Sequence, residues 1–144
     1  MVTTDRECRY CHETFTPPKP ETTLCRSCYY EGRHLREHHA DLIGRLGDLD
    51  TVATANVWHT GGGCFGLAVT LQDERLFFGT VAMMELDENG TAVWRGDAWI
   101  PTEPEERWMI GVYASEAAFS DGEEPTRIIM PATDDEFVAA VQEA

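Results

Sequence analysis

Four cysteines near the start of the chain form two closely spaced pairs. They are Cys8 and Cys11, then Cys25 and Cys28, with thirteen residues between the pairs. Two residues between cysteines allow one backbone turn to aim both sulfurs at the same point, and a short hairpin can bring two such turns together. Four thiolates arranged in this way match the tetrahedral coordination of Zn²⁺ in closed structural sites. The spacing therefore predicts one structural zinc ion held by these four cysteines.

Disulfide bonds are the alternative use of the same cysteines, and they would leave the fifth, Cys64, without a partner. Residues Met1 to Glu7 are polar and contain no apolar run, so we expect no signal peptide. No stretch approaches the roughly 20 apolar residues that a membrane helix needs. We therefore expect a reducing, cytoplasmic compartment and no membrane partner, and in such a compartment metal binding is favoured over disulfides.

The chain around the cysteines has turn-forming and then helical character. Three prolines between the two pairs stiffen the return of the chain. The proline-free run Tyr29 to Leu46 carries a broken helical stripe of apolar residues. With Phe15 and the four cysteines, this segment resembles the treble-clef zinc fingers over about residues 8–45. The resemblance implies a cysteine knuckle, a hairpin and a second cysteine pair at the start of a helix, in a family that serves DNA binding, protein binding or scaffolding.

Beyond Gly47 the sequence turns to β structure. Runs of strand-forming residues lie at 51–58, 64–71, 75–86, 91–99, 108–113 and 127–130. Asn89-Gly90 is a strong hairpin signal, and Thr133 is a suitable N-cap for a helix over 134–143. The sequence predicts an α+β fold, with a four-cysteine zinc finger and helix in residues 1–47 and an acidic antiparallel β-meander domain with a C-terminal helix in residues 48–144.

Charge is divided unevenly along the chain. The net charge is −15, from 26 acidic and 11 basic residues. Residues 1–47 carry seven acids and seven bases, whereas residues 48–144 carry nineteen acids and only four bases. An acidic surface repels the phosphates of nucleic acids and attracts a basic partner. Solubility alone is the simpler interpretation of the same excess.

A glycine-rich loop is the second local feature. Gly61, Gly62 and Gly63 are consecutive and lie between two predicted strands. Glycines reach backbone torsions that other residues avoid, and successive N–H groups in such a loop can cradle an anion. We take the loop and its neighbours as candidate contacts with a ligand or partner: Trp58, His59, Gly61, Gly62, Gly63 and Cys64.

Cys64 and His59 also suggest a thiol nucleophile with a histidine base. A tight turn with a buried Cys64 is the alternative, and we assign no catalytic residue. His34 and His38 are four residues apart on the predicted helix, but the HExxH pattern of metalloproteases is absent. We interpret these two histidines and His39 as exposed and solvated.

Residues 56–115 are similar to small uncharacterised proteins carried by phages of actinobacteria. The shared features are the glycine loop, the hairpin meander and the strand ending Gly111-Val112-Tyr113. This resemblance implies an accessory or host-interaction factor, located in the host cytoplasm if phage-encoded.

We therefore expect a non-enzymatic, zinc-containing binding module that acts on a protein partner, which the acidic charge suggests is basic. One alternative is a binding protein for a small, nucleotide-like ligand held by the Gly61–Gly63 loop. A second alternative is nucleic-acid binding through the zinc finger. The sequence does not fix an oligomeric state.

Overall fold

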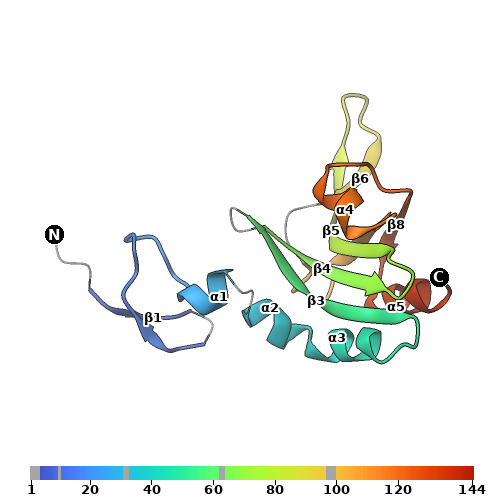
Figure 1. The fold of residues 1–144 in the computed structure, drawn as a ribbon. Coiled ribbons are helices and arrows are strands. Elements are labelled where there is room, and N and C mark those ends of the chain that lie inside the picture. Colours follow the sequence, from blue (N-terminus) through green and yellow to red (C-terminus); the bar gives the residue numbers. More distant parts are fainter. Residues whose placement is uncertain (1–3, 10, 31–32, 62–63, 97–99) are drawn as a thin grey trace.

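The computed structural model of the protein describes residues 4–9, 11–30, 33–61, 64–96 and 100–144. A segment that carries the four cysteines lies beside a body of one antiparallel sheet and several helices (Figure 1). The predicted α+β class is confirmed, because a cysteine cluster precedes a six-stranded antiparallel sheet with helices around it. In the part of the chain that is described, no helix is both long enough and apolar enough to span a bilayer.

The N-terminal elements are short. Strands β1 (Arg6–Glu7) and β2 (Thr14–Phe15) pair antiparallel. Helices α1 (Arg26–Tyr30), α2 (Arg33–His38) and α3 (Ala40–Gly47) follow. The helical character expected over residues 29–46 is found, but not as one continuous helix. Helix α2 ends and α3 begins on either side of His39, which is the N-cap of α3 and has φ −105° and ψ 20°.

The main sheet is a meander with one branch. Its strands β3 (Val52–Gly61), β4 (Cys64–Leu71), β5 (Leu76–Leu86), β7 (Arg107–Tyr113) and β8 (Arg127–Ala132) lie side by side in that order. Among the described strands, β6 (Ala92–Gly96) pairs with the second half of β5 alone. The hairpin predicted at Asn89-Gly90 joins β5 and β6, and Gly90 adopts the positive φ of 78° that the turn requires.

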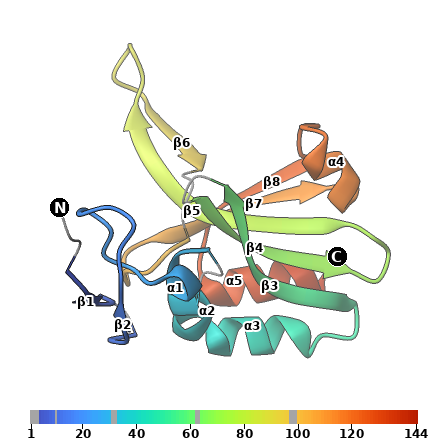
Figure 2. The ribbon, with the colours of Figure 1, turned by 60° about the vertical axis from the view of Figure 1, so that its left-hand side comes forward.

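One face of the sheet holds the main hydrophobic core. Alternate residues of β4 point into it, and Phe65, Leu67 and Val69 are each at most 2% exposed. Helices α3 and α5 (Asp134–Gln142) cover this face side by side (Figure 2). The predicted N-cap of α5 is confirmed, because the Thr133 side chain accepts a hydrogen bond from the backbone N–H of Glu136.

Leu35, Leu42 and Leu46, which precede residue 48, lie in this same core. The division into domains 1–47 and 48–144 stays a prediction. The packing shows that α2 and α3 contribute apolar side chains to the sheet, and thereby connect the cysteine segment to the body of the protein.

The opposite face of the sheet carries partly exposed aromatic rings. Helix α4 (Glu116–Ser120), which the sequence did not predict, places Phe119 against Phe78 with 4.5 Å between ring centroids. Phe78 itself lies over Gly66, where a Cβ atom would stand 2.0 Å from the ring. Glycine at position 66 is therefore required by close packing.

His39 is buried, so the prediction that it is exposed is wrong. The residue is 6% exposed, and its Nε2–H donates a hydrogen bond to the carbonyl oxygen of Pro101, 62 residues further along the chain. The ring also contacts Trp108, with 5.4 Å between centroids. Burial lowers the pKa of His39, and the neighbouring His38 acts in the same direction against the opposing effects of the Pro101 carbonyl and Asp134.

Replacement of Gly66 tests the packing of the aromatic face. Gly66→Ala should lower the free energy of unfolding by about 1–3 kcal/mol, because the new methyl group must displace the Phe78 ring. Gly44→Ala is the matched control, since Gly44 lies in α3 with open space around it and alanine there should raise stability by up to about 1 kcal/mol. Urea denaturation measures both changes, and an unaltered stability of Gly66→Ala would contradict this packing.

The buried His39 predicts a pH effect on stability. Its folded-state pKa is lowered, so the unfolded chain takes up a proton near the ordinary value of about 6.5 while the folded protein does not. The stability that neutral His39 contributes is present above about pH 6.5 and is lost as the pH falls towards the lowered pKa. His39→Gln keeps an N–H donor and removes the titration.

The measurement is the difference in unfolding free energy between wild type and His39→Gln, taken near neutral pH and in mild acid. The advantage of the wild type should shrink in acid. His38→Gln, at an exposed position next to His39, should change the pH dependence much less than His39→Gln does, because burial is the larger cause of the lowered pKa of His39. An equal pH dependence in wild type and His39→Gln would show that His39 does not contribute.

Candidate metal centre

The first cysteine pair lies in a tight turn between β1 and β2. The backbone N–H of His12 donates to the carbonyl of Cys8 at 3.0 Å, and the N–H of Cys8 donates to the carbonyl of Glu13 at 2.8 Å. His12 has φ 64°, a left-handed conformation that is uncommon for a residue with a side chain. These bonds reverse the chain within six residues and direct Cys8 and Cys11 to the same side.

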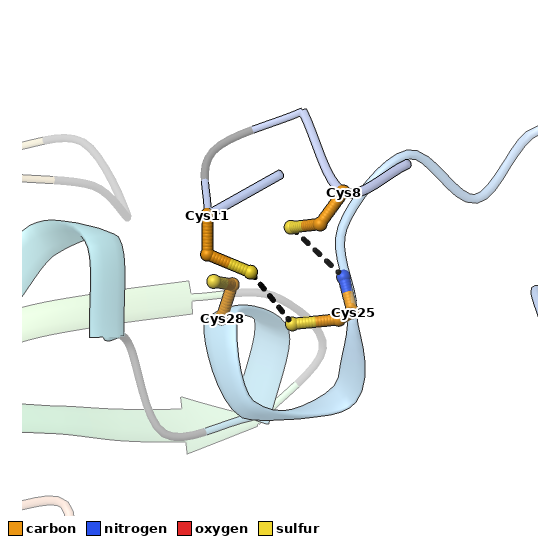
Figure 3. A group of neighbouring side chains, drawn as sticks. All are labelled: Cys8, Cys11, Cys25 and Cys28. Carbon is orange, nitrogen blue, oxygen red and sulfur yellow. Dashed lines mark hydrogen bonds between the residues drawn. The ribbon is translucent and has the colours of Figure 1, made fainter. Parts of the chain in front are cut away.

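The second pair lies where the chain enters α1. Cys25 immediately precedes this helix and Cys28 is in its first turn, so both thiols face the first pair (Figure 3). Hydrogen bonds from backbone N–H groups help to connect the two halves. The N–H of Arg9 donates to the carbonyl of Thr23 at 2.9 Å, and the N–H of Cys25 donates to Sγ of Cys8 at 3.3 Å.

The four sulfur atoms form one compact group. All lie within 4.8 Å of one another, and the sulfurs of Cys11 and Cys25 are 3.6 Å apart. A tetrahedron with Zn–S bonds of about 2.3 Å has sulfur–sulfur distances of about 3.8 Å, so the thiol arrangement fits such an ion. None of the five cysteines forms a disulfide bond, so the disulfide alternative is not the arrangement found.

Burial disfavours the charged thiolate form of these cysteines when no cation is bound. Cys8 and Cys28 are fully buried, Cys25 is 7% exposed, and Cys11 is half-buried. Desolvation raises the pKa of the Cys28 thiol, and the thiols of Cys25 and Cys8 add to the effect. A bound cation reverses this preference, because metal ligation requires thiolates and compensates their charge.

The local hydrophobic cluster is small. Among the described side chains, the hydrophobic cluster at the site consists of three of the cysteines themselves, with Phe15, Leu24 and Cys11 packed against them. A segment with so little apolar burial depends on other interactions for its folding. The thiol cluster is the feature around which these residues are organised.

The sequence did not predict the groups that support the site. His12 is next to Cys11, yet its Nδ1 lies 2.7 Å from Oε1 of Glu7, so the ring is directed to that carboxylate. Arg6 donates from Nη1 to the carbonyl of Thr22 at 2.9 Å, which fastens β1 to the returning chain. Of the described residues, only the four cysteines form a group of three or more side chains that could hold a metal ion.

The candidate contacts at the glycine loop lie on a different element, the β3–β4 hairpin. Trp58 is half-buried, with its ring centroid 6.4 Å from that of Phe78, and His59 packs against Phe65 at 4.8 Å. Cys64 is half-buried and faces Gly61 across the hairpin. Gly62 and Gly63 lie outside the described residues, so the assignment of this loop as a contact surface stays a prediction.

No family model, no curated protein and no solved structure matches this chain. The four clustered cysteines are consistent with the predicted resemblance to a zinc finger. The resemblance of residues 56–115 to phage proteins stays a prediction.

Metal content tests the site directly. We expect one zinc per chain in protein purified under reducing conditions, and a large loss of metal in Cys28→Ser, because this thiol is fully buried in the cluster. Cys64→Ser is the matched control, since Cys64 lies on β4 and not in the cluster, and it should bind as much metal as the wild type. Equal metal content in the two variants, measured by mass spectrometry, would contradict the assignment.

Proposed function

We propose that this protein is a non-enzymatic binding module in which a structural zinc ion orders the N-terminal segment and the protein acts on a protein partner. The observation that carries the proposal is the closed group of four thiols, three of them buried. Thiolate-only coordination is typical of structural zinc, whereas catalytic zinc keeps a position open for water or substrate. Soft thiolate ligands in a tetrahedral group also favour zinc over the hard cations calcium and magnesium.

Electrostatics support a protein partner that is basic. Of the four basic residues after position 47, Arg75 bonds to Asp73 at 2.8 Å and Arg107 donates to the carbonyls of Pro104 and Glu106. These cations are therefore turned towards their own chain, while nineteen acids remain in the same region. Such a surface attracts a basic partner and accelerates encounter with it.

The same charges disfavour nucleic acid as the partner. In the N-terminal part, Arg33 is shared between Glu37 at 3.1 Å and Glu13 at 3.7 Å. An arginine held between two carboxylates is less free to neutralise a phosphate. The phage-type role of a host-interaction or regulatory factor is part of this proposal, and it rests on the resemblance of residues 56–115 to phage proteins.

The binding experiment uses the full zinc-loaded chain as bait in an extract of the native cellular context. We expect retention of a specific protein whose yield falls as ionic strength rises from about 50 mM to about 500 mM, because screening shortens the reach of the acidic surface. Retention that does not change with salt would contradict a basic partner.

Two parallel assays cover the alternatives. A mobility shift of duplex DNA at low salt that is lost in Arg26→Glu, but kept in the control Arg75→Glu, would replace the proposal by nucleic-acid binding. Saturable thermal stabilisation by a nucleotide, lost in Gly62→Val, would replace it by small-ligand binding. The proposal predicts neither result.

A further inference from the structure

The β5–β6 hairpin extends beyond the rest of the sheet as an arm. Strand β4 pairs with β5 only from Leu76 to Gly79, and β7 pairs only as far as Ala82. From Met83 to Leu86, β5 pairs with β6 alone among the described strands. Both views show this hairpin projecting away from the helices and from the remaining strands (Figures 1 and 2).

Large apolar side chains are concentrated on this arm and are exposed. Leu86 is 72% exposed, Met84 59%, Val93 45% and Met83 40%. In the described part of the chain, the other large apolar side chains with such exposure are Ile128 and Met130 on β8. Met84 and Leu86 share one face of the strand, and Met83 shares the other with the acidic Glu85, so the arm carries apolar side chains on both faces. Contiguous exposed apolar groups of this kind mark interaction surfaces.

The tip of the arm is already ordered. The carboxylate of Asp87 accepts hydrogen bonds from the N–H groups of Asn89 at 2.8 Å and Thr91 at 2.9 Å. The Gly90 N–H donates to the carbonyl of Asp87 at 3.0 Å. A rigid turn lowers the entropy that binding must overcome, so the arm is preorganised for insertion into a partner.

Charge decides which partner fits. Glu85, Asp87 and Glu88 lie on the arm, whereas Arg95, opposite Met83 at the base of the hairpin, is the one basic residue in the sequence from Met83 to Gly96. A second copy of this chain would bring its own −15 charge and its own acidic arm to the contact, and like charges oppose that association. A basic surface with an apolar groove complements both properties of the arm.

We propose that the β5–β6 hairpin, residues 83–93, is the docking arm of this protein, and that its apolar side chains enter a groove rimmed by lysine or arginine on a basic protein partner. This inference rests on the proposed function, since it names the surface through which the protein partner is bound. Met84 and Leu86 are the central contacts, and Glu85, Asp87 and Glu88 meet the basic rim.

Methionine methyl NMR on the full zinc-loaded protein tests the arm with an internal control. The probe is a synthetic amphipathic helix composed of leucine and lysine, and the matched probe replaces every lysine by glutamate. Addition of the basic peptide should shift the methyl signals of Met83 and Met84. Met130 lies on β8 and is 36% exposed, close to the exposure of Met83, and its signal should shift little. The acidic peptide should shift none of these methyl signals.

Binding measurements on variants make the test quantitative. Met84→Thr combined with Leu86→Thr keeps strand-forming residues and should weaken binding of the basic peptide by about tenfold or more, because two large apolar contacts are removed. Ile128→Thr combined with Met130→Thr is the matched control on β8 and should bind as the wild type does. Near-native circular dichroism and metal content in both double variants establish that folding is intact.

Three outcomes would overturn the inference. If the basic peptide binds equally well to wild type and the Met84/Leu86 variant, the arm is not the docking surface, while the proposed protein-binding function stands. If neither peptide binds the wild type, a basic apolar partner is excluded. If the wild type forms a dimer in sedimentation that the Met84/Leu86 variant does not form, the arm serves self-association instead.

Discussion

Four thiols gathered within 4.8 Å of one another are the constraint on which the N-terminal part of this protein depends. The segment from Arg6 to Cys28 has two strands of two residues each and, among its described side chains, a very small apolar cluster, so its own burial contributes little to folding. Hydrogen bonds shape the turns, but they do not by themselves compensate the cost of ordering this length of chain. A cation that binds all four thiolates would supply the missing free energy, because binding occurs only in the folded arrangement.

Helices α2 and α3 connect the cysteine segment to the rest of the molecule. Leu35 and Leu46 are fully buried in the same core as the strands, and His39 between them is hydrogen bonded to Pro101. The cysteine segment is thereby followed at once by helices that are fixed on the sheet. The β5–β6 arm extends from this sheet, so the molecule joins a segment organised around four thiols to a body that carries excess negative charge and an apolar arm.

Sequence reasoning succeeded where a feature is local. The spacing of the cysteines alone indicates a metal site. The backbone preference of Asn89-Gly90 alone indicates a turn, and Thr133 caps a helix by a hydrogen bond from the backbone of a residue three positions away. It failed where a contact joins distant segments. The burial of His39 depends on a carbonyl 62 residues later, and α4 is a five-residue helix held by Phe119 against rings from β5 and β7. The arm was predicted as two ordinary strands joined by a turn, although the adjacent pair Met83-Met84 already departs from strict alternation.

X-ray absorption at the zinc edge tests the central claim most directly, because it reports the ligands of the metal itself in the intact reduced protein. The structure predicts a single shell of four sulfur atoms at about 2.3 Å, with no nitrogen or oxygen ligand. A first shell that contains nitrogen or oxygen, or a folded protein in which these cysteines carry no metal, would contradict a closed thiolate site as the organising centre of the N-terminal segment.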